Sequence, residues 1–297
     1  MVKYTLNNDY QPVDLSKAVI QSLPDNIDVL RLDRIHPVVS GNKWFKLKYH
    51  LQEAIKQHAA GIVTFGGAWS NHLVATAFAC RQAGLHSIGI IRGEEPAQLS
   101  ATLQDASEYG MQLKFVSRSA YTDYQPKQFP DHYIVPMGGQ SHLGVMGAAE
   151  ILSLIPYEQY PYIACAVGTG TMMAGLVRAS LPHQLVIGIS SLKIPAGTDN
   201  SLHHFVAQQT GRKNFTILSE YHFGGYAHKT NHLFQFMNDL YDQHHLPTDF
   251  VYTGKLLFGI MHVVSTGYSP AGSRILVIHS GGLQGNRSLP DGTLTFL

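Results

Sequence analysis

The segment SGNKWFKLKYHL, residues 40–51, contains the first side chain that could do covalent chemistry. A Gly-Asn turn brings Lys43 to the expected start of a helix. The amino end of a helix is the positive end of its dipole, and this position disfavours the charged form of an amine. A lysine with a lowered pKa can act as a nucleophile or a base. The alternative interpretation is a solvated surface lysine.

A second group of polar residues follows the strand-like run TFGG within TFGGAWSNH, residues 64–72. The expected helix opens on Ser70, Asn71 and His72. Backbone amides and short polar side chains at such a helix start can hold a carboxylate or a phenolic oxygen. Ligands of open α/β sheets commonly bind beyond the carboxyl ends of strands. An ordinary helix N-cap is the alternative.

The segment AVGTGTMMAGLV, residues 166–177, has the composition of a phosphate-binding loop. Its glycines let backbone amides approach an anion, and its threonines add hydroxyl donors. It is not a dinucleotide fingerprint, because Met173 occupies the place of the third glycine. No Gly-Lys-Ser/Thr follows, so it is not a Walker A loop either. A plain glycine-rich turn is the alternative.

Two tyrosines and two hydroxyl side chains complete the candidates. Tyr226 lies in FGGYAHK, residues 223–229, and Tyr252 and Thr253 lie in FVYTGKLLFG, residues 250–259. Ser280 lies in LVIHSGG, residues 276–282, at the end of the last strand-like run. The tyrosines could supply a stacking face or a phenol near a substrate amine. A half-buried packing role is the alternative for each.

The elements that position these residues alternate along the chain. Short apolar runs and longer amphipathic ones indicate strands joined by crossover helices in parallel α/β layers. Most strand-like runs lack polar alternation, as strands covered on both faces do. The expected strands are 27–33, 61–67, 87–93, 111–117, 132–136, 162–168, 184–190 and 274–282, and the expected helices are near 43–58, 70–83, 97–109, 142–155, 171–180, 199–210, 229–244 and 255–266.

Composition excludes several partners. The 21 Lys and Arg balance 20 Asp and Glu without a basic run, so neither nucleic acid nor a membrane surface is an expected partner. No leader and no run of 18 apolar residues is visible, which predicts a cytoplasmic protein. Cys80 and Cys165 lack ligand-like spacing and are expected to be buried thiols. His203-His204 and His244-His245 are adjacent pairs and no HExxH motif is present, so no metal site is predicted.

Taken in this order, the segments resemble the pyridoxal 5′-phosphate (PLP) dependent family of 1-aminocyclopropane-1-carboxylate (ACC) deaminases and D-cysteine desulfhydrases. The resemblance covers about residues 28 to 285. Its most specific pieces are GNKxxKL at 41–47, GGxxSNH at 66–72 and VYTGK at 251–255. It implies the α/β architecture of fold type II, with two three-layer α/β/α domains and mainly parallel sheets. A smaller domain at 52–144 would be inserted in a larger one formed by 1–51 and 145–297, with PLP in the cleft.

The resemblance also assigns roles. Lys43 corresponds to the lysine that forms a Schiff base with PLP, and Asn71 to the residue that bonds the pyridoxal 3′-oxygen. The catalytic residues it implies are Lys43, Ser70, Tyr226 and Tyr252; the cofactor-binding residues are Lys43, Lys46, Asn71, Gly168, Thr169, Gly170, Thr171, Thr253 and Ser280; the substrate-binding residues are Trp69, Ser70, Asn71 and His72. A homodimer is implied as well.

Two positions differ from the usual family residues, and two others distinguish the activities found within the family. Phe45 replaces a usual arginine and Trp69 a usual glutamine, changes expected at the mouth of the site. ACC deaminases have a glutamate at the position of Thr253 and a leucine at that of Ser280. A carboxylate would hold the pyridine nitrogen protonated, which the opening of a cyclopropane needs, whereas a neutral hydroxyl would not.

The expected activity is therefore that of a PLP-dependent carbon–sulfur lyase. It would eliminate a β-substituent from a small amino acid, as D-cysteine desulfhydrase does, and release a 2-oxo acid, ammonia and sulfide. The alternatives are an ACC deaminase, a D-serine-type ammonia-lyase, and an inert carrier of PLP or a nucleotide.

Overall fold

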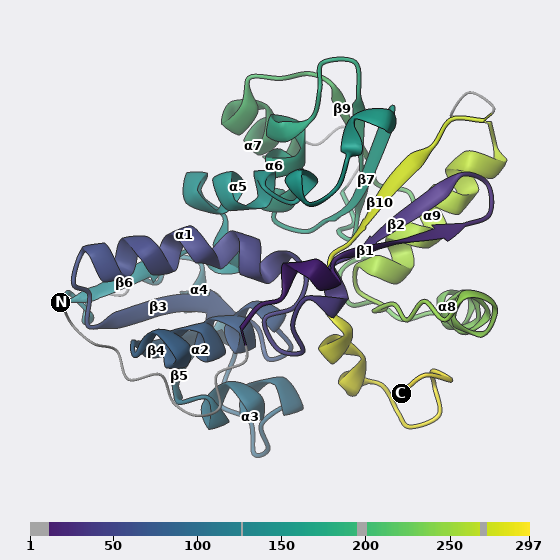
Figure 1. The fold of residues 1–297 in the computed structure, drawn as a ribbon. Helices are drawn as coiled ribbons and strands as arrows, with labels where there is room; N and C mark the ends of the chain where they lie inside the picture. Colours follow the sequence, from purple (N-terminus) through teal and green to yellow (C-terminus); the bar gives the residue numbers. More distant parts are fainter. Residues whose placement is uncertain (1–11, 126, 195–200, 268–271) are drawn as a thin grey trace.

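The computed structural model describes residues 12–125, 127–194, 201–267 and 272–297. Within these ranges the chain forms two mainly parallel sheets with helices on their faces (Figure 1). The larger sheet has the strand order β1-β2-β10-β7-β8-β9, and β1 runs antiparallel to β2. Its strands are Val19–Leu23 (β1), Ile27–Arg31 (β2), Tyr162–Val167 (β7), Leu185–Ser190 (β8), Phe215–Leu218 (β9) and Ile275–His279 (β10).

The smaller sheet has the order β5-β4-β3-β6, and its three strand pairs are parallel. Its strands are Gly61–Gly66 (β3), His86–Arg92 (β4), Met111–Val116 (β5) and His132–Val135 (β6). All four belong to the segment 52–144, which was expected to form the smaller domain. The domain boundaries themselves stay a prediction.

The helices cover both faces of the larger sheet and connect it to the smaller one. In Figure 1, α5, α6 and α7 lie on one side of the larger sheet, and α8 and α9 on the other. Helix α1 packs against both α5 and α2 and so joins the two halves. The helices are Asn42–Lys56 (α1), Asn71–Ala83 (α2), Ala101–Glu108 (α3), Arg118–Tyr121 (α4), His142–Ala149 (α5), Thr171–Ala179 (α6), Ser201–Thr210 (α7), Asn231–His244 (α8) and Thr253–Ser265 (α9).

Burial explains why the central strands lack polar alternation. On β7, Ile163 and Cys165 belong to the core under α5 and α6, whereas Ala164 and Ala166 belong to the core under α9. Successive side chains of a strand point to opposite faces, so both faces must be apolar when both are covered. The expected α/β/α layering with mainly parallel sheets is confirmed.

The eight expected strands are all present, and the differences lie at edges and helix ends. Strands β1 and β9 were not predicted. The helix expected over 142–155 ends at Ala149, and the one expected from 97 begins at Ala101, where Ser100 caps it by accepting from the Leu103 amide. Among the described residues, no helix has the length and apolarity to cross a membrane.

Candidate active site

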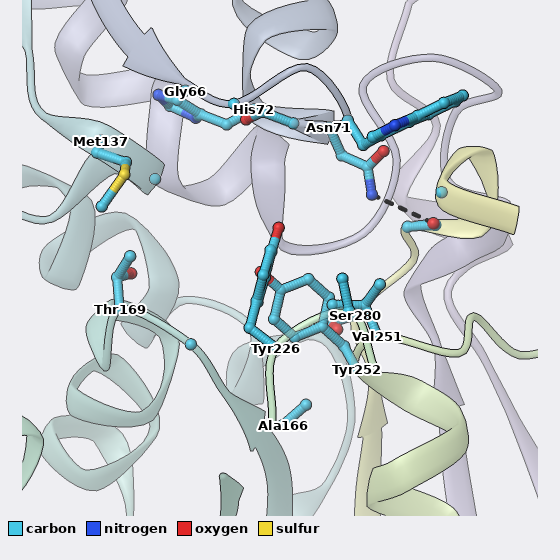
Figure 2. Close-up of a pocket in the computed structure, with 18 of the residues that line it drawn as sticks. Gly66, Asn71, His72, Met137, Ala166, Thr169, Tyr226, Val251, Tyr252 and Ser280 are labelled. Atoms are coloured by element: carbon cyan, nitrogen blue, oxygen red, sulfur yellow. Dashed lines mark hydrogen bonds between the residues drawn. The ribbon is translucent and has the colours of Figure 1, made fainter. Parts of the chain in front are cut away.

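A cavity of about 640 Å³ opens beyond the carboxyl ends of β3, β7 and β10. Residues at or beyond strands of both sheets line it, and Figure 2 shows several lining residues, which include Asn71, Thr169, Tyr226 and Ser280. The sequence motifs, which are far apart in the chain, therefore converge on one space. The predicted site residues that line it are Lys43, Lys46, Trp69, Ser70, Asn71, His72, Gly168, Thr169, Gly170, Tyr226, Tyr252 and Ser280.

Lys43 and Lys46 lie one turn apart on α1 and both line the cavity. Burial lowers the pKa of Lys43 to about 8, although the Asp249 carboxylate opposes the shift. Burial and the charge of Lys43 lower the pKa of Lys46 to about 7. The Lys43 ammonium donates to Asn42 Oδ1 over 2.7 Å. The expected lowering of the Lys43 pKa is present, but its main cause is desolvation rather than the helix dipole.

Gly41 is required where α1 begins. Its φ is +63°, and a Cβ there would lie 1.8 Å from the carbonyl oxygen of Ser280. The Asn42 amide donates to that same oxygen over 3.2 Å. The start of α1 and the end of β10 are thus in direct contact, which places Lys43 and Ser280 on the same cavity.

The start of α2 presents polar groups that capping does not use. Ser70 is the N-cap residue, but its side chain makes no capping hydrogen bond, so the simple N-cap interpretation does not account for its hydroxyl. Asn71 Nδ2 donates to the Gly282 carbonyl over 3.2 Å (Figure 2). Asn71 Oδ1 is buried and has no partner among the described residues. Buried polar atoms of this kind normally bond a ligand or water.

The bonding around His72 defines its tautomer. Thr64 donates its hydroxyl proton to the Val135 carbonyl, so its oxygen must accept from His72 Nε2 at 2.9 Å. His72 Nδ1 is then unprotonated, and it has no partner among the described residues. Burial, followed by the charges of Lys43 and Lys46, holds the pKa of His72 well below its usual range. His72 Nδ1 can therefore accept a hydrogen bond from a ligand, but it cannot donate one to a carboxylate.

The glycine-rich loop leads from β7 into the amino end of α6. Gly168, Thr169 and Gly170 line the cavity, whereas Thr171 lies outside the lining and shares a hydrogen bond with Thr169 over 3.0 Å. Gly170 has a φ of +80°, and a Cβ there would lie 3.1 Å from the Phe205 ring. Glycine is therefore needed for the approach of the backbone, as an anion cradle requires.

The two tyrosines lie together at the cavity, with ring centroids 6.1 Å apart in an edge-to-face arrangement. Burial and the neighbouring Tyr226 phenol raise the pKa of Tyr252 well above its usual value, and burial raises that of Tyr226. Both phenols are thus protonated donors near neutral pH. Figure 2 shows the Tyr226 ring extending into the pocket.

Thr253 is placed differently from the expectation. It is completely buried, lies outside the cavity lining, and donates its hydroxyl to Asp249 Oδ1 over 2.7 Å. The same carboxylate accepts the backbone amides of residues 251, 252 and 253 at 2.8 to 3.0 Å. Asp249 thereby organises the start of α9. The Thr253 hydroxyl is hydrogen-bonded to Asp249, so Thr253 does not present a free hydroxyl to the cavity.

Phe45 also requires a correction. It is 1% exposed and lies in the main core, so its replacement of an arginine does not alter the mouth of the site. Trp69 is 40% exposed and does line the cavity. The sequence interpretation missed Arg92 and Met137, which also line it. They lie at or just beyond the carboxyl ends of β4 and β6, neighbours of β3, and that position was the signal available.

Comparison with known proteins identifies the family. A model of the pyridoxal-phosphate dependent enzymes matches residues 20–281. The chain belongs to this family. It is therefore a PLP-dependent enzyme, and the interpretation as an inert carrier is set aside.

Relatives of this PLP-dependent enzyme include a bifunctional D-cysteine desulfhydrase/ACC deaminase of Arabidopsis thaliana, 26% identical over 95% of this chain and 79% of the relative. A D-cysteine desulfhydrase of Salmonella choleraesuis is 22% identical over 85% of this chain and 86% of its own. A solved ACC deaminase homologue superposes with a TM-score of 0.77 at 25% identity, covering 91% and 90% of the two chains. These similarities support the ACC deaminase/D-cysteine desulfhydrase group within the family.

The cavity of this PLP-dependent enzyme fits its cofactor. Lys43 provides an amine with a lowered pKa, and the loop 168–170 leads into a helix start suited to a phosphate. The unpartnered Asn71 Oδ1 and the remaining N–H of its amide provide bonding groups between these two. Covalent attachment, phosphate binding and ring contact are thus all provided for by residues in one space.

The lowered Lys43 pKa predicts how PLP attachment depends on pH. Attachment needs the unprotonated amine, whose fraction rises about tenfold per pH unit below the pKa. We expect the rate of covalent attachment to the cofactor-free protein to rise with pH and to level off above about pH 8. Borohydride trapping at timed intervals measures it. A rate that continues to rise to pH 10 would indicate an ordinary lysine.

Substitution of Gly170 tests the phosphate cradle. Gly170→Ala should weaken PLP binding by roughly tenfold or more, because the new Cβ would press on the Phe205 ring and shift the loop backbone. Its positive φ also costs stability, about 1–2 kcal/mol. Gly110→Ala is the matched control, since Gly110 has a φ of +87° with nothing within 4 Å of its would-be Cβ. Equal PLP affinity in both folded variants, measured by titration, would exclude this loop.

Proposed function

We propose that this enzyme eliminates the β-substituent of a small D-amino acid, with D-cysteine as the representative substrate. The products would be a 2-oxo acid, ammonia and sulfide. The observation that carries the proposal is the absence of any Asp or Glu among the described residues that line the cavity. Such a site has no acid to hold a pyridine nitrogen protonated.

The consequence concerns which bonds can be broken. Opening an unactivated cyclopropane requires a strong electron sink, whereas a thiolate is a good leaving group and needs less assistance. Ser280 contributes a neutral hydroxyl to the cavity, and the nearby Asp249 carboxylate is engaged by the start of α9. This chemistry favours elimination over ACC deamination. The Salmonella relative is a D-cysteine desulfhydrase, which agrees with this choice, whereas the Arabidopsis relative is named for both activities.

Proton removal, carboxylate binding and proton donation would fall to different residues of the chain. When bound, PLP withdraws electrons from the α-carbon of an attached amino acid. Lys43 would remove the α-proton, because its lowered pKa leaves a useful fraction of neutral amine near pH 7. The Ser70 hydroxyl and the start of α2 would hold the substrate carboxylate. Tyr226 or Tyr252, both protonated, would donate to the departing sulfur.

Cofactor contacts would come from the same lining. Lys43 would hold PLP covalently, and residues 168–170 with the amino end of α6 would hold its phosphate. Lys46 would add positive charge near the cofactor, Asn71 would bond the 3′-oxygen, and Trp69 would border the substrate. A homodimer and a cytoplasmic location stay predictions.

A product assay tests the proposal. D-cysteine, β-chloro-D-alanine, D-serine and ACC should be supplied separately to the PLP-loaded enzyme, with L-cysteine as the stereochemical control. We expect pyruvate from the first two and negligible 2-oxobutyrate from ACC. Efficient ACC deamination would instead identify an ACC deaminase, and pyruvate from D-serine alone would indicate an ammonia-lyase.

A further inference from the structure

The segment 221–228, between β9 and α8, carries Tyr226 in an unusual backbone conformation. Phe223 and Ala227 have φ values of +51° and +55°, and Gly224 and Gly225 have values of +101° and +121°. Each non-glycine residue in the left-handed region costs on the order of 1–2 kcal/mol. A segment of this kind persists only when surrounding contacts determine it.

Lys255, in the first turn of α9, makes those contacts. Its side chain is 0% exposed, and its Nζ donates to the carbonyl oxygens of His222 at 2.9 Å and Gly225 at 2.7 Å. These two carbonyls lie on either side of Phe223 and Gly224, so a single ammonium closes the turn. Bonds from a charged donor are stronger than neutral ones, the more so where water is excluded.

Other contacts place the segment on α9, and Tyr226 itself contacts the Tyr252 ring. The Phe223 ring packs edge-to-face on Phe258 at 4.9 Å, and Gly259 leaves room for the Tyr221 ring. Tyr226 is 51% exposed and touches the cavity from one side. The backbone immediately before Tyr226 is therefore fixed by the bond from Lys255 to Gly225.

We propose that Lys255 is a positioning residue that clamps the 221–228 segment and so holds Tyr226 at the cavity beside Tyr252. Lys255 acts through the backbone and does not contact the cavity. The proposal rests on the proposed function only where it concerns turnover, since the clamp is a property of the fold.

The test compares the PLP-loaded wild type with Lys255→Met, which keeps the apolar stem and removes the donors. We expect hydrogen–deuterium exchange at the amides of 222–228 to accelerate tenfold or more. Lys255→Arg, which keeps charge and donors, should restore protection. Leu103→Ala, in the buried core under α3, is the control for lost stability and should leave exchange in 222–228 unchanged.

A double-mutant cycle separates positioning from general stability. Lys255→Met should lower kcat/KM for the eliminated substrate by nearly the same factor as Tyr226→Ala, and by less than about twofold in the Tyr226→Ala background. Should Lys255→Met fail to fold, Lys255→Gln takes its place in both measurements. Unchanged exchange in a folded variant, or fully additive losses, would overturn the proposal. If the wild type turns over none of the substrates, only the proposed function fails and the exchange result still decides the clamp.

Discussion

Lys43→Ala should contain no covalently attached PLP and should lose elimination activity by at least about a thousandfold, since the change removes both the attachment point and the base. The cavity should remain, because Lys43 is one of many residues that line it and Asn42 keeps its own backbone bond to Ser280. Mass spectrometry after borohydride treatment measures attachment, and pyruvate release measures turnover.

Lys46→Ala is the matched control for this result. It removes the neighbouring buried amine and should retain covalent PLP on Lys43. It should leave the pKa of Lys43 near 8, because Lys46, whose pKa is about 7, is already neutral where Lys43 titrates. Reducible PLP in Lys43→Ala, mapped to Lys46, would instead move the attachment to the second lysine.

Asp249→Ala should reduce the free energy of unfolding by about 3–5 kcal/mol, which is the range for breaking a buried charged network. Its carboxylate accepts three backbone amides and the Thr253 hydroxyl, and all four donors lose this partner in the variant. Chemical denaturation of the cofactor-free protein measures the loss.

Asp105→Ala is the control for this substitution. Asp105 pairs with Arg287 at the surface, and partly exposed pairs contribute no more than about 1 kcal/mol. A loss below 1 kcal/mol for Asp249→Ala would show that the start of α9 does not depend on this residue.

The central strands were predictable because burial on both faces leaves a continuous apolar run, as in IACAV of β7. Strand β1 has an exposed or half-exposed pattern along most of its length, and β9 has only four residues at the opposite edge. Edge strands bury little, so their sequences resemble loops. Helix ends were shifted because local caps such as Ser100 decide them rather than periodicity.

The convergence of the motifs was predictable for a different reason. Carboxyl ends of neighbouring parallel strands meet at one edge, so the turns after β7 and β10 of the larger sheet had to lie together. The turn after β3 belongs to the smaller sheet, and only the family resemblance, which implies a cofactor in the cleft between two domains, brought it to the same space. The hydrogen-bond partners and the burial of individual side chains were not predictable. The Thr253 hydroxyl is directed to Asp249 and Phe45 into the core, and a type of residue at a motif position does not show which neighbour it will bond.

The position of β10 has a consequence for the order of synthesis. This strand follows β9 in the sequence yet lies between β2 and β7, and the residues after it provide Ser280. A nascent chain that stops before residue 275 therefore has two unpaired strand edges where the centre of the larger sheet should be. It also lacks the carbonyl against which Gly41 and Asn42 position Lys43. Cofactor capture must thus await synthesis of β10 and Ser280, and the incomplete chain depends on protection from aggregation until then.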